Sequence, residues 1–243
     1  EEDHAGSSVA GVGDTNGDSI LDVIVGCPWG SVPSSRIVYG PITSTVDLAT
    51  SDAWLFGDSG TYTGHGSDLA DMDGDGLADA LVGAYNVLGS SGALYVSYGP
   101  VSGGLDVVSD VDATIDGPGT GSYMGRQARG GGDINGDGIG DAMVSAPYAS
   151  TYGASLGMVV VAHMPIYGHI AAEDADLHLV GEVAGSTVGI SMAMDDHNAD
   201  GYDDMLIGAS TTSVTASMEG AAYLVLGPTS GAIDLGAAEV IVR

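Results

Sequence analysis

The chain has 243 residues, and its 33 acidic against 4 basic side chains give a formal net charge of −29 at pH 7. A protein with this negative charge repels nucleic acid and anionic membrane surfaces, and we therefore expect neither as a partner. Apolar residues make up 44% of the chain, which is enough for a packed core. No apolar stretch is long enough to enter and cross a bilayer. The single cysteine, Cys27, excludes an intrachain disulfide, and we expect it to be a small buried residue.

The first predicted unit contains four segments of strand length and one acidic loop. It starts with a Gly- and Ser-rich run, continues through the acidic loop, and ends with three runs rich in β-branched and aromatic residues. Gly, Pro, Asp or Ser bounds each run, which is typical of short strands. In chain order these segments are residues 6–10, 14–22, 23–26, 36–39 and 53–56.

The same order of segments recurs three more times. Successive acidic loops start 57, 62 and 63 residues apart, at Asp14, Asp71, Asp133 and Asp196. No helical periodicity is apparent in any copy. The copies cover residues 1–57, 58–117, 118–181 and 182–243.

Four antiparallel strands per copy predict an all-β fold, a β-propeller of four four-stranded blades in one domain over residues 1–243. One copy cannot bury both faces of its sheet, so neighbouring copies have to stack. The small residues of the first strand suit the crowded axis of such an array.

The acidic loops carry side-chain oxygens at positions 1, 3, 5 and 9. Three carboxylates held so close repel one another, and a hard divalent cation removes this conflict. The all-oxygen set suits calcium, so we expect up to four calcium ions, one per copy. These residues are Asp14, Asn16, Asp18 and Asp22; Asp71, Asp73, Asp75 and Asp79; Asp133, Asn135, Asp137 and Asp141; and Asp196, Asn198, Asp200 and Asp204.

Position 6 is glycine in three loops, where it permits a sharp turn that directs the next backbone carbonyl to the ion. The first loop has Ser19 there, at a cost on the order of 1–2 kcal/mol for a left-handed turn, so we expect its site to be the weakest. The predicted carbonyl ligands are Ile20, Leu77, Ile139 and Tyr202.

The loop opens like an EF-hand but does not continue as one. An EF-hand has Glu at position 12, whereas this chain has Val25, Val82, Val144 and Ile207 there. Position 9 must therefore close the coordination shell directly. A solvated turn is the alternative for one Asp-rich loop alone, but four loops in register favour the metal.

These residues resemble the FG-GAP repeats of the integrin α-subunit propeller and its bacterial relatives. The resemblance covers essentially the whole chain, and a strand ending near Gly-Ala-Pro follows each loop, as in Ser145-Ala146-Pro147. It implies calcium bound in the hairpin between the first two strands of each blade. It also implies a secreted or cell-surface protein with a role in adhesion or scaffolding.

The number of blades differs from that family, because the integrin propeller has seven and this chain has four copies. The array is therefore a small ring, part of a larger ring, or an open arc that assembles with other copies. An unclosed array exposes apolar blade faces, so we expect a homo-oligomer, either a ring or a filament.

Two non-enzymatic functions remain. The sequence has no nucleophile elbow, zinc motif or phosphate loop, so we expect no enzyme activity. A calcium-stabilised structural or adhesion protein is the first interpretation. The alternative is a module that binds a glycan or an extracellular protein through aromatic side chains on the face opposite the metal loops, where Tyr62 and Tyr123 lie nearby. These side chains are Trp29, Tyr85, Tyr148 and Tyr152. Ordinary packing of tyrosines at turns is the simpler explanation of these side chains.

Overall fold

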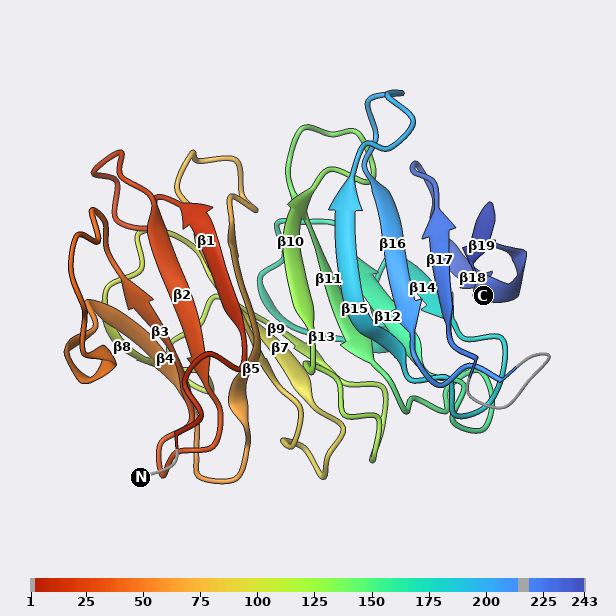
Figure 1. Ribbon diagram of the computed structural model, residues 1–243, viewed down its shortest axis with the longest axis horizontal. Coiled ribbons are helices and arrows are strands. Elements are labelled where there is room, and N and C mark those ends of the chain that lie inside the picture. The colour runs from red at the N-terminus through yellow and green to blue at the C-terminus, as the bar shows by residue number, and fades with distance from the viewer. Residues whose placement is uncertain (1–2, 214–218, 243) are drawn as a thin grey trace.

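The computed structural model describes residues 3–213 and 219–242, which form four sheets arranged as an arch (Figure 1). The first sheet contains β1 (Val9–Gly13), β2 (Asp22–Cys27), β3 (Ser34–Val38), β4 (Ala53–Phe56) and β8 (Gly103–Asp106). The second contains β5 (Thr63–Ala70), β6 (Asp79–Ala84), β7 (Ala93–Ser97), β9 (Ala113–Asp116) and β13 (Gly168–Ala171). The third contains β10 (Ala128–Gly132), β11 (Asp141–Ala146), β12 (Met158–Ala162), β14 (Leu177–Val180) and β18 (Gly231–Asp234). The fourth contains β15 (Val188–Asp195), β16 (Asp204–Ala209), β17 (Ala221–Val225) and β19 (Val240–Val242).

The four strands predicted for each copy pair in chain order as an antiparallel meander. In the first sheet β1 pairs with β2, β2 with β3, and β3 with β4. The other three sheets repeat this order, so the all-β prediction is confirmed. The described residues form an open arch, with β1 in the sheet at one end and β19 in the sheet at the other (Figure 1).

The prediction of four strands in each sheet is wrong for three of the four sheets. A fifth strand, donated by the next copy along the chain, pairs in parallel with the outer strand of the preceding sheet: β8 with β4, β13 with β9, and β18 with β14. Each donated strand is only four residues long and starts at a glycine with φ between 67° and 82°. A short segment that starts in this way has the sequence signature of a loop rather than a strand.

A short 3-10 turn follows the donated strand in the third and fourth copies, and the corresponding residues 44–47 in the first copy. These turns are η1 (Leu48–Thr50), η2 (Ala172–Asp174) and η3 (Leu235–Ala237). In the described parts of the chain, no helix is long and apolar enough to cross a membrane.

Each pair of neighbouring sheets encloses its own apolar core. Ile24 and Leu55 of the first sheet pack with Val82 of the second. Two equivalent cores lie between the second and third sheets and between the third and fourth sheets. The first two sheets approach closely at their inner strands: a Cβ added to Gly26 of β2 would lie 2.0 Å from the carbonyl oxygen of Gly64 in β5, and one added to Gly13 of β1 would lie 2.2 Å from the Cβ of Ala78. Cys27 is buried, as expected.

Candidate metal loops and the aromatic row

The four acidic loops lie on one side of the arch, because each connects the first strand of a sheet to its second strand (Figure 1). In every loop, the carboxylate at position 1 accepts backbone N–H groups from within the loop. The Oδ1 atom of Asp71 accepts from Gly74 at 2.8 Å, and its Oδ2 atom accepts from Gly76 at 2.9 Å. The carboxylate at position 5 accepts in the same way, from Leu77 to Asp75 at 2.7 Å in this loop. Each loop is therefore folded tightly around its own carboxylates.

The carboxylates at position 9 are buried and hydrogen-bonded on both oxygens. Asp79 is fully buried; its Oδ2 atom accepts from the N–H of Met72 at 2.6 Å, and its Oδ1 atom accepts from the N–H of Gly99 at 2.8 Å. Gly99 precedes Pro100 at the end of the third strand of the sheet. The same pair of contacts recurs at Asp22, Asp141 and Asp204. Position 9 thus ties its loop to the third strand, a role that the sequence pattern did not predict.

Burial also raises the pKa of two of these position 9 carboxyl groups. It raises the pKa of Asp79 to about 7, although the N–H donors of Gly99 and Met72 oppose this shift. It raises the pKa of Asp141 to about 6 in the same way. A cation next to such a group stabilises its charged form.

The donor set of the second loop fits a hard divalent cation. Carboxylate oxygens of Asp71, Asp73 and Asp79 lie within 4.8 Å of one another. Oxygen ligands gathered in this way suit calcium. The other loops have Asn at position 3, as in Asn16, and keep the Asp residues at positions 1, 5 and 9. The carbonyl ligands expected at position 7 stay predictions.

Two loops place a side chain where the backbone is left-handed. Ser19, at position 6 of the first loop, has φ 67°, the conformation expected for it. Ala199, at position 4 of the fourth loop, has φ 60°, whereas the other loops have glycine there. Both residues cost conformational energy that glycine avoids. The strain at Ala199 was not predicted from the sequence.

Neighbouring loops also contact each other through the side chain at position 7. A Cβ on Gly136, at position 4 of the third loop, would lie 2.3 Å from Cε1 of Tyr202 in the fourth loop. Leu77 lies over Gly17 in the same manner: its Cδ2 atom is 3.5 Å from the position that a Cβ on Gly17 would occupy. The four loops therefore form a continuous series along the arch.

A row of aromatic rings follows the second strands on the side opposite the acidic loops. The rings of Tyr62 and Tyr85 stack at 4.7 Å with an interplanar angle of 6°. Tyr123 lies 5.9 Å from Tyr85, and Tyr148 lies 5.7 Å from Tyr123. Trp29 joins the row through Tyr62 at 5.9 Å. The structure thus brings together Trp29, Tyr85 and Tyr148, three of the four predicted ligand-face residues.

Tyr152, the fourth of these residues, contacts His178 at 5.7 Å, which places it outside the chain of ring contacts. Arg126, which the sequence reading did not select, lies in the row instead, with its guanidinium 5.2 Å from the centre of the Tyr85 ring. Its Nε atom is buried without a hydrogen-bond partner. Arg126 lines a hollow with Tyr85, Tyr123 and Tyr148. The one available signal was its rarity, because the chain has only 4 basic residues.

Comparison with known proteins gives limited similarity. No family model matches the chain. It is 29% identical over 217 residues to integrin alpha-PS2 of Drosophila melanogaster, which spans 81% of this chain and 14% of the integrin. A crystal structure of the Vibrio cholerae biofilm matrix protein Bap1 aligns with 96% of this chain and 38% of that chain, at 16% identity and a TM-score of 0.38, too low to bear on the fold. The chain therefore covers a minor part of both proteins, and the sequence similarity supports an integrin-like repeat at most.

Proposed function

We propose that this chain is a non-enzymatic, extracellular repeat protein with a structural or adhesive role, in which calcium stabilises an array of FG-GAP-type blades. The observation that carries the proposal is the recurrence of one loop design in all four copies on one side of the arch. In the second loop, three carboxylates converge within 4.8 Å. The proposal assigns one calcium ion to each loop.

The ligands of each ion would be the side chains at positions 1, 3, 5 and 9 and the carbonyl at position 7. The bound ion supplies positive charge that offsets the repulsion among these carboxylates. The N–H donors within the loop already hold the carboxylate at position 1 in place, as Gly74 and Gly76 do for Asp71. The chain therefore arranges much of the site before the ion arrives, which limits the ordering needed for binding.

Calcium bound in a loop would strengthen the whole sheet. The carboxylate at position 9 connects the loop to the third strand, as Asp79 does through Gly99. The side chain at position 7 connects it to the preceding loop, as Tyr202 does over Gly136. An ion at one site thus supports both its own sheet and the contact with the neighbouring sheet.

An extracellular location is supported by three features. Extracellular calcium modules bind at about 10⁻⁴–10⁻³ M, a range suited to calcium levels outside cells. The net charge of −29 suits a protein that binds cations. The sequence similarity to an integrin α subunit points the same way.

Calorimetric titration of calcium into metal-stripped protein tests the assignment. We expect heat of binding with a stoichiometry approaching four ions per chain. Asp75→Asn, at a position that is Asp in all four loops, should remove one site and leave the others in place. Ser102→Asn, an exposed substitution outside the loops, is the control. An absence of binding heat, together with a melting temperature unaffected by chelator, would contradict the proposal.

A second candidate function, ligand binding at the aromatic row, is favoured by Arg126. Its side chain lines a hollow with three tyrosines, where a glycan could stack on the rings and accept a hydrogen bond from the guanidinium. A glycan array read with wild type and with Arg126→Gln tests this function. Binding that is lost in the variant supports it, and equal silence of both proteins contradicts it.

A further inference from the structure

The two ends of the arch carry complementary unpaired parts. Within the described residues, β19 has no strand on its outer side, whereas the equivalent strands β4, β9 and β14 each pair with a donated strand. At the other end, residues 44–47 of the first copy correspond to the donated strands but form no strand. One end thus lacks a strand, and the other end has a segment without a sheet.

The correspondence of residues 44–47 with the donated strands follows from the sequence on both sides. Ser44 lies three residues after Pro41, as Gly103 lies three residues after Pro100. A 3-10 turn follows at Leu48–Thr50, capped by Asp47, and its counterpart Leu235–Ala237 is capped by Asp234. The segment therefore has the flanking structure of a donated strand and lacks only the acceptor sheet.

Exposure confirms that this segment is unpartnered. Ile42 is 45% exposed, whereas its counterpart Val101 is 1% exposed against the preceding sheet. Leu48 is half-buried, whereas its counterpart Leu235 is fully buried. Ile42 and Leu48 are thus more exposed than the apolar side chains at the corresponding positions Val101 and Leu235.

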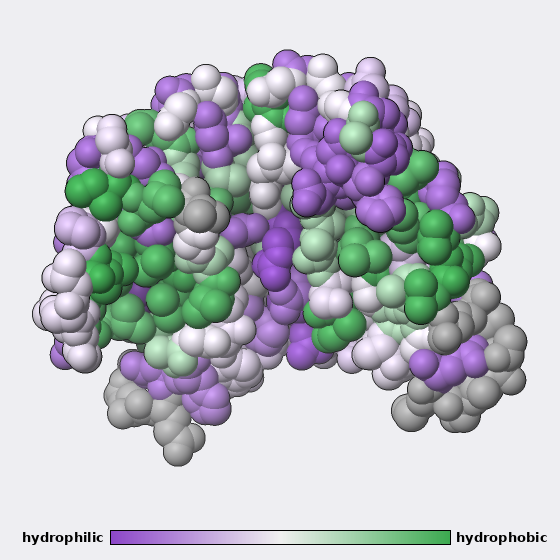
Figure 2. Space-filling model, turned by 45° about the horizontal axis from the view of Figure 1, so that its top comes forward, coloured by the Kyte–Doolittle hydropathy of each residue, from purple (hydrophilic) through white to green (hydrophobic). Residues whose placement is uncertain are grey.

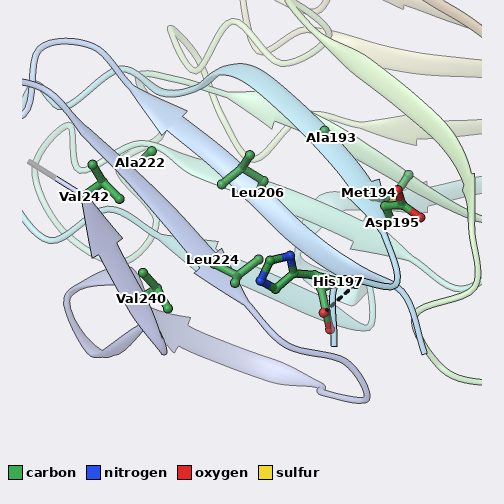
Figure 3. A pocket seen from close by; sticks show the side chains of 10 residues that line it. Ala193, Met194, Asp195, His197, Leu206, Ala222, Leu224, Val240 and Val242 are labelled. Atoms are coloured by element: carbon green, nitrogen blue, oxygen red, sulfur yellow. Dashed lines mark hydrogen bonds between the residues drawn. The ribbon is translucent and has the colours of Figure 1, made fainter. Parts of the chain in front are cut away.

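The flat faces of the two end sheets show the same pattern. In the fourth sheet Leu206, Leu224, Val240 and Val242 point into one apolar hollow on the outward face (Figure 3). In the first sheet, Val9, Val23 and Val25 line a second apolar hollow. It lies on the face that, in each later copy, packs against the preceding sheet. Figure 2 shows apolar side chains gathered on both arms of the arch, with hydrophilic side chains between them.

We propose that a second copy of this chain covers these faces, with residues 44–46 of one copy added in parallel to β19 of the other. The inference rests on the proposed function, because it names the partner of the same repeat array. The parallel pairs Ala53 with Gly103 and Leu55 with Leu105 set the register. Transferred to the end sheet, this register places Ser44 opposite Val240 and Val46 opposite Val242.

The same docking would complete the series of acidic loops. Ile20, at position 7 of the first loop, is 38% exposed, and no loop of the described residues covers it. Ala199, at position 4 of the fourth loop, is covered by no later loop within residues 3–213 and 219–242. Docking of two copies brings Ile20 of one copy over Ala199 of the other, in the way that Ile139 lies over Gly74 within the chain. There, a Cβ added to Gly74 would lie 3.7 Å from Cγ1 of Ile139. An alanine is tolerated there because this spacing leaves room for a Cβ.

The arch makes a closed pair the expected assembly. Apolar surface on both arms of the arch is turned toward the viewer in Figure 2, an arrangement that suits a closed pair. Two arches placed end to end bury both pairs of faces in two equivalent interfaces related by a two-fold axis. No apolar end remains for further growth.

Solution mass in the presence of calcium tests the closed pair. We expect twice the 24.1 kDa of one chain. Leu206→Asp and Val46→Asp should each convert the protein to a monomer, because each places a charge in the interface. Val108→Asp is the matched control, since Val108 is 70% exposed on a segment outside both interfaces. A monomer at the highest soluble concentration, or a polymer that grows with concentration, would overturn the proposal.

Cross-linking tests the register independently of mass. In a Cys27→Ala background, Ser44→Cys combined with Val240→Cys should give covalent dimers with a short bifunctional thiol reagent. Ser44→Cys combined with Val108→Cys should give none, and equal yields from both pairs would overturn the register. The two proposals fail separately: a monomer with normal calcium binding overturns only the assembly, and a dimer without calcium binding overturns only the metal assignment.

Discussion

Apolar residues at equivalent positions of the four copies have different environments in the middle of the arch and at its ends. Ile24, Leu81, Met143 and Leu206 occupy one position of the second strand in the four copies. The first three are fully buried because a following sheet packs on them, and Leu206 is 49% exposed because no sheet of the described residues follows it. Val82 and Val25 differ in the same way at the other end of the array. The comparison teaches that burial in this protein is decided by the neighbouring sheet, as in other stacked repeats.

Calcium removal should have the largest effect on stability, in the middle and at the ends alike. At a free calcium concentration ten times the dissociation constant, four sites together stabilise the fold by about 6 kcal/mol. We therefore expect a large fall in melting temperature in chelator, measured by circular dichroism, and its recovery on adding calcium back. Magnesium should restore less, because its smaller ion demands a stricter geometry. Equal melting curves with and without chelator would show that the loops do not need an ion.

Truncation of the buried and exposed leucines should separate the middle of the arch from its ends. Leu81→Ala should lower the free energy of unfolding by about 2–5 kcal/mol, because it leaves a cavity between two sheets. Leu206→Ala should cost less than about 1 kcal/mol in the monomeric protein, because its side chain is half in solvent. Urea denaturation measures both values. Equal losses would mean that the end face is as well covered as the interior, which the closed pair would explain at high protein concentration.

Position 9 should differ from the other acidic positions of the same loop. Asp79→Ala leaves the N–H groups of Gly99 and Met72 without their acceptor, so we expect a loss of about 1–3 kcal/mol even in chelator. Asp75→Asn should destabilise the protein only when calcium is present. Thermal melts of both variants with and without chelator test this difference. If both variants depend on calcium to the same extent, the tie between loop and third strand has no energetic weight.

The smallest expected effects come from the strained loops of the two end sheets. Ser19→Gly and Ala199→Gly should each stabilise the protein by up to about 1 kcal/mol, because glycine adopts positive φ without the Cβ penalty. Gly76→Ala, the reverse change in the second sheet, should destabilise it by a similar amount. Differential scanning calorimetry resolves these shifts when the variants are compared in one buffer. Stabilisation at Ser19 together with tighter calcium binding would support the expectation that the first site is the weakest.

The sequence was sufficient for the parts of the fold that depend on local pattern. Runs such as residues 53–56 and 113–116 became β4 and β9 because apolar strand residues bounded by turn residues specify a strand locally. The donated strands were missed because their pairing depends on a partner more than 40 residues away, as between Ala53 and Gly103. No local pattern records such a partner.

The candidate site divides in the same way. The spacing of Asp71, Asp73 and Asp79 was enough to place three carboxylates together, because a tight loop fixes their separation. The second role of Asp79 was missed because it involves Gly99, in a different part of the copy. Arg126 was missed because its neighbours Tyr85 and Tyr148 come from two different sheets. Contacts between distant segments therefore mark the limit of what the sequence alone predicted.

The donated strands also determine where the chain can be divided. A fragment ending at residue 57 contains a whole sequence copy, yet its first sheet would lose β8, which lies at Gly103–Asp106. Such a fragment exposes the edge of β4 and removes cover from Leu55. An expression boundary drawn after the turn at residues 107–110 keeps the first sheet intact, so the smallest fragment with a complete first sheet is nearly twice as long as one sequence repeat.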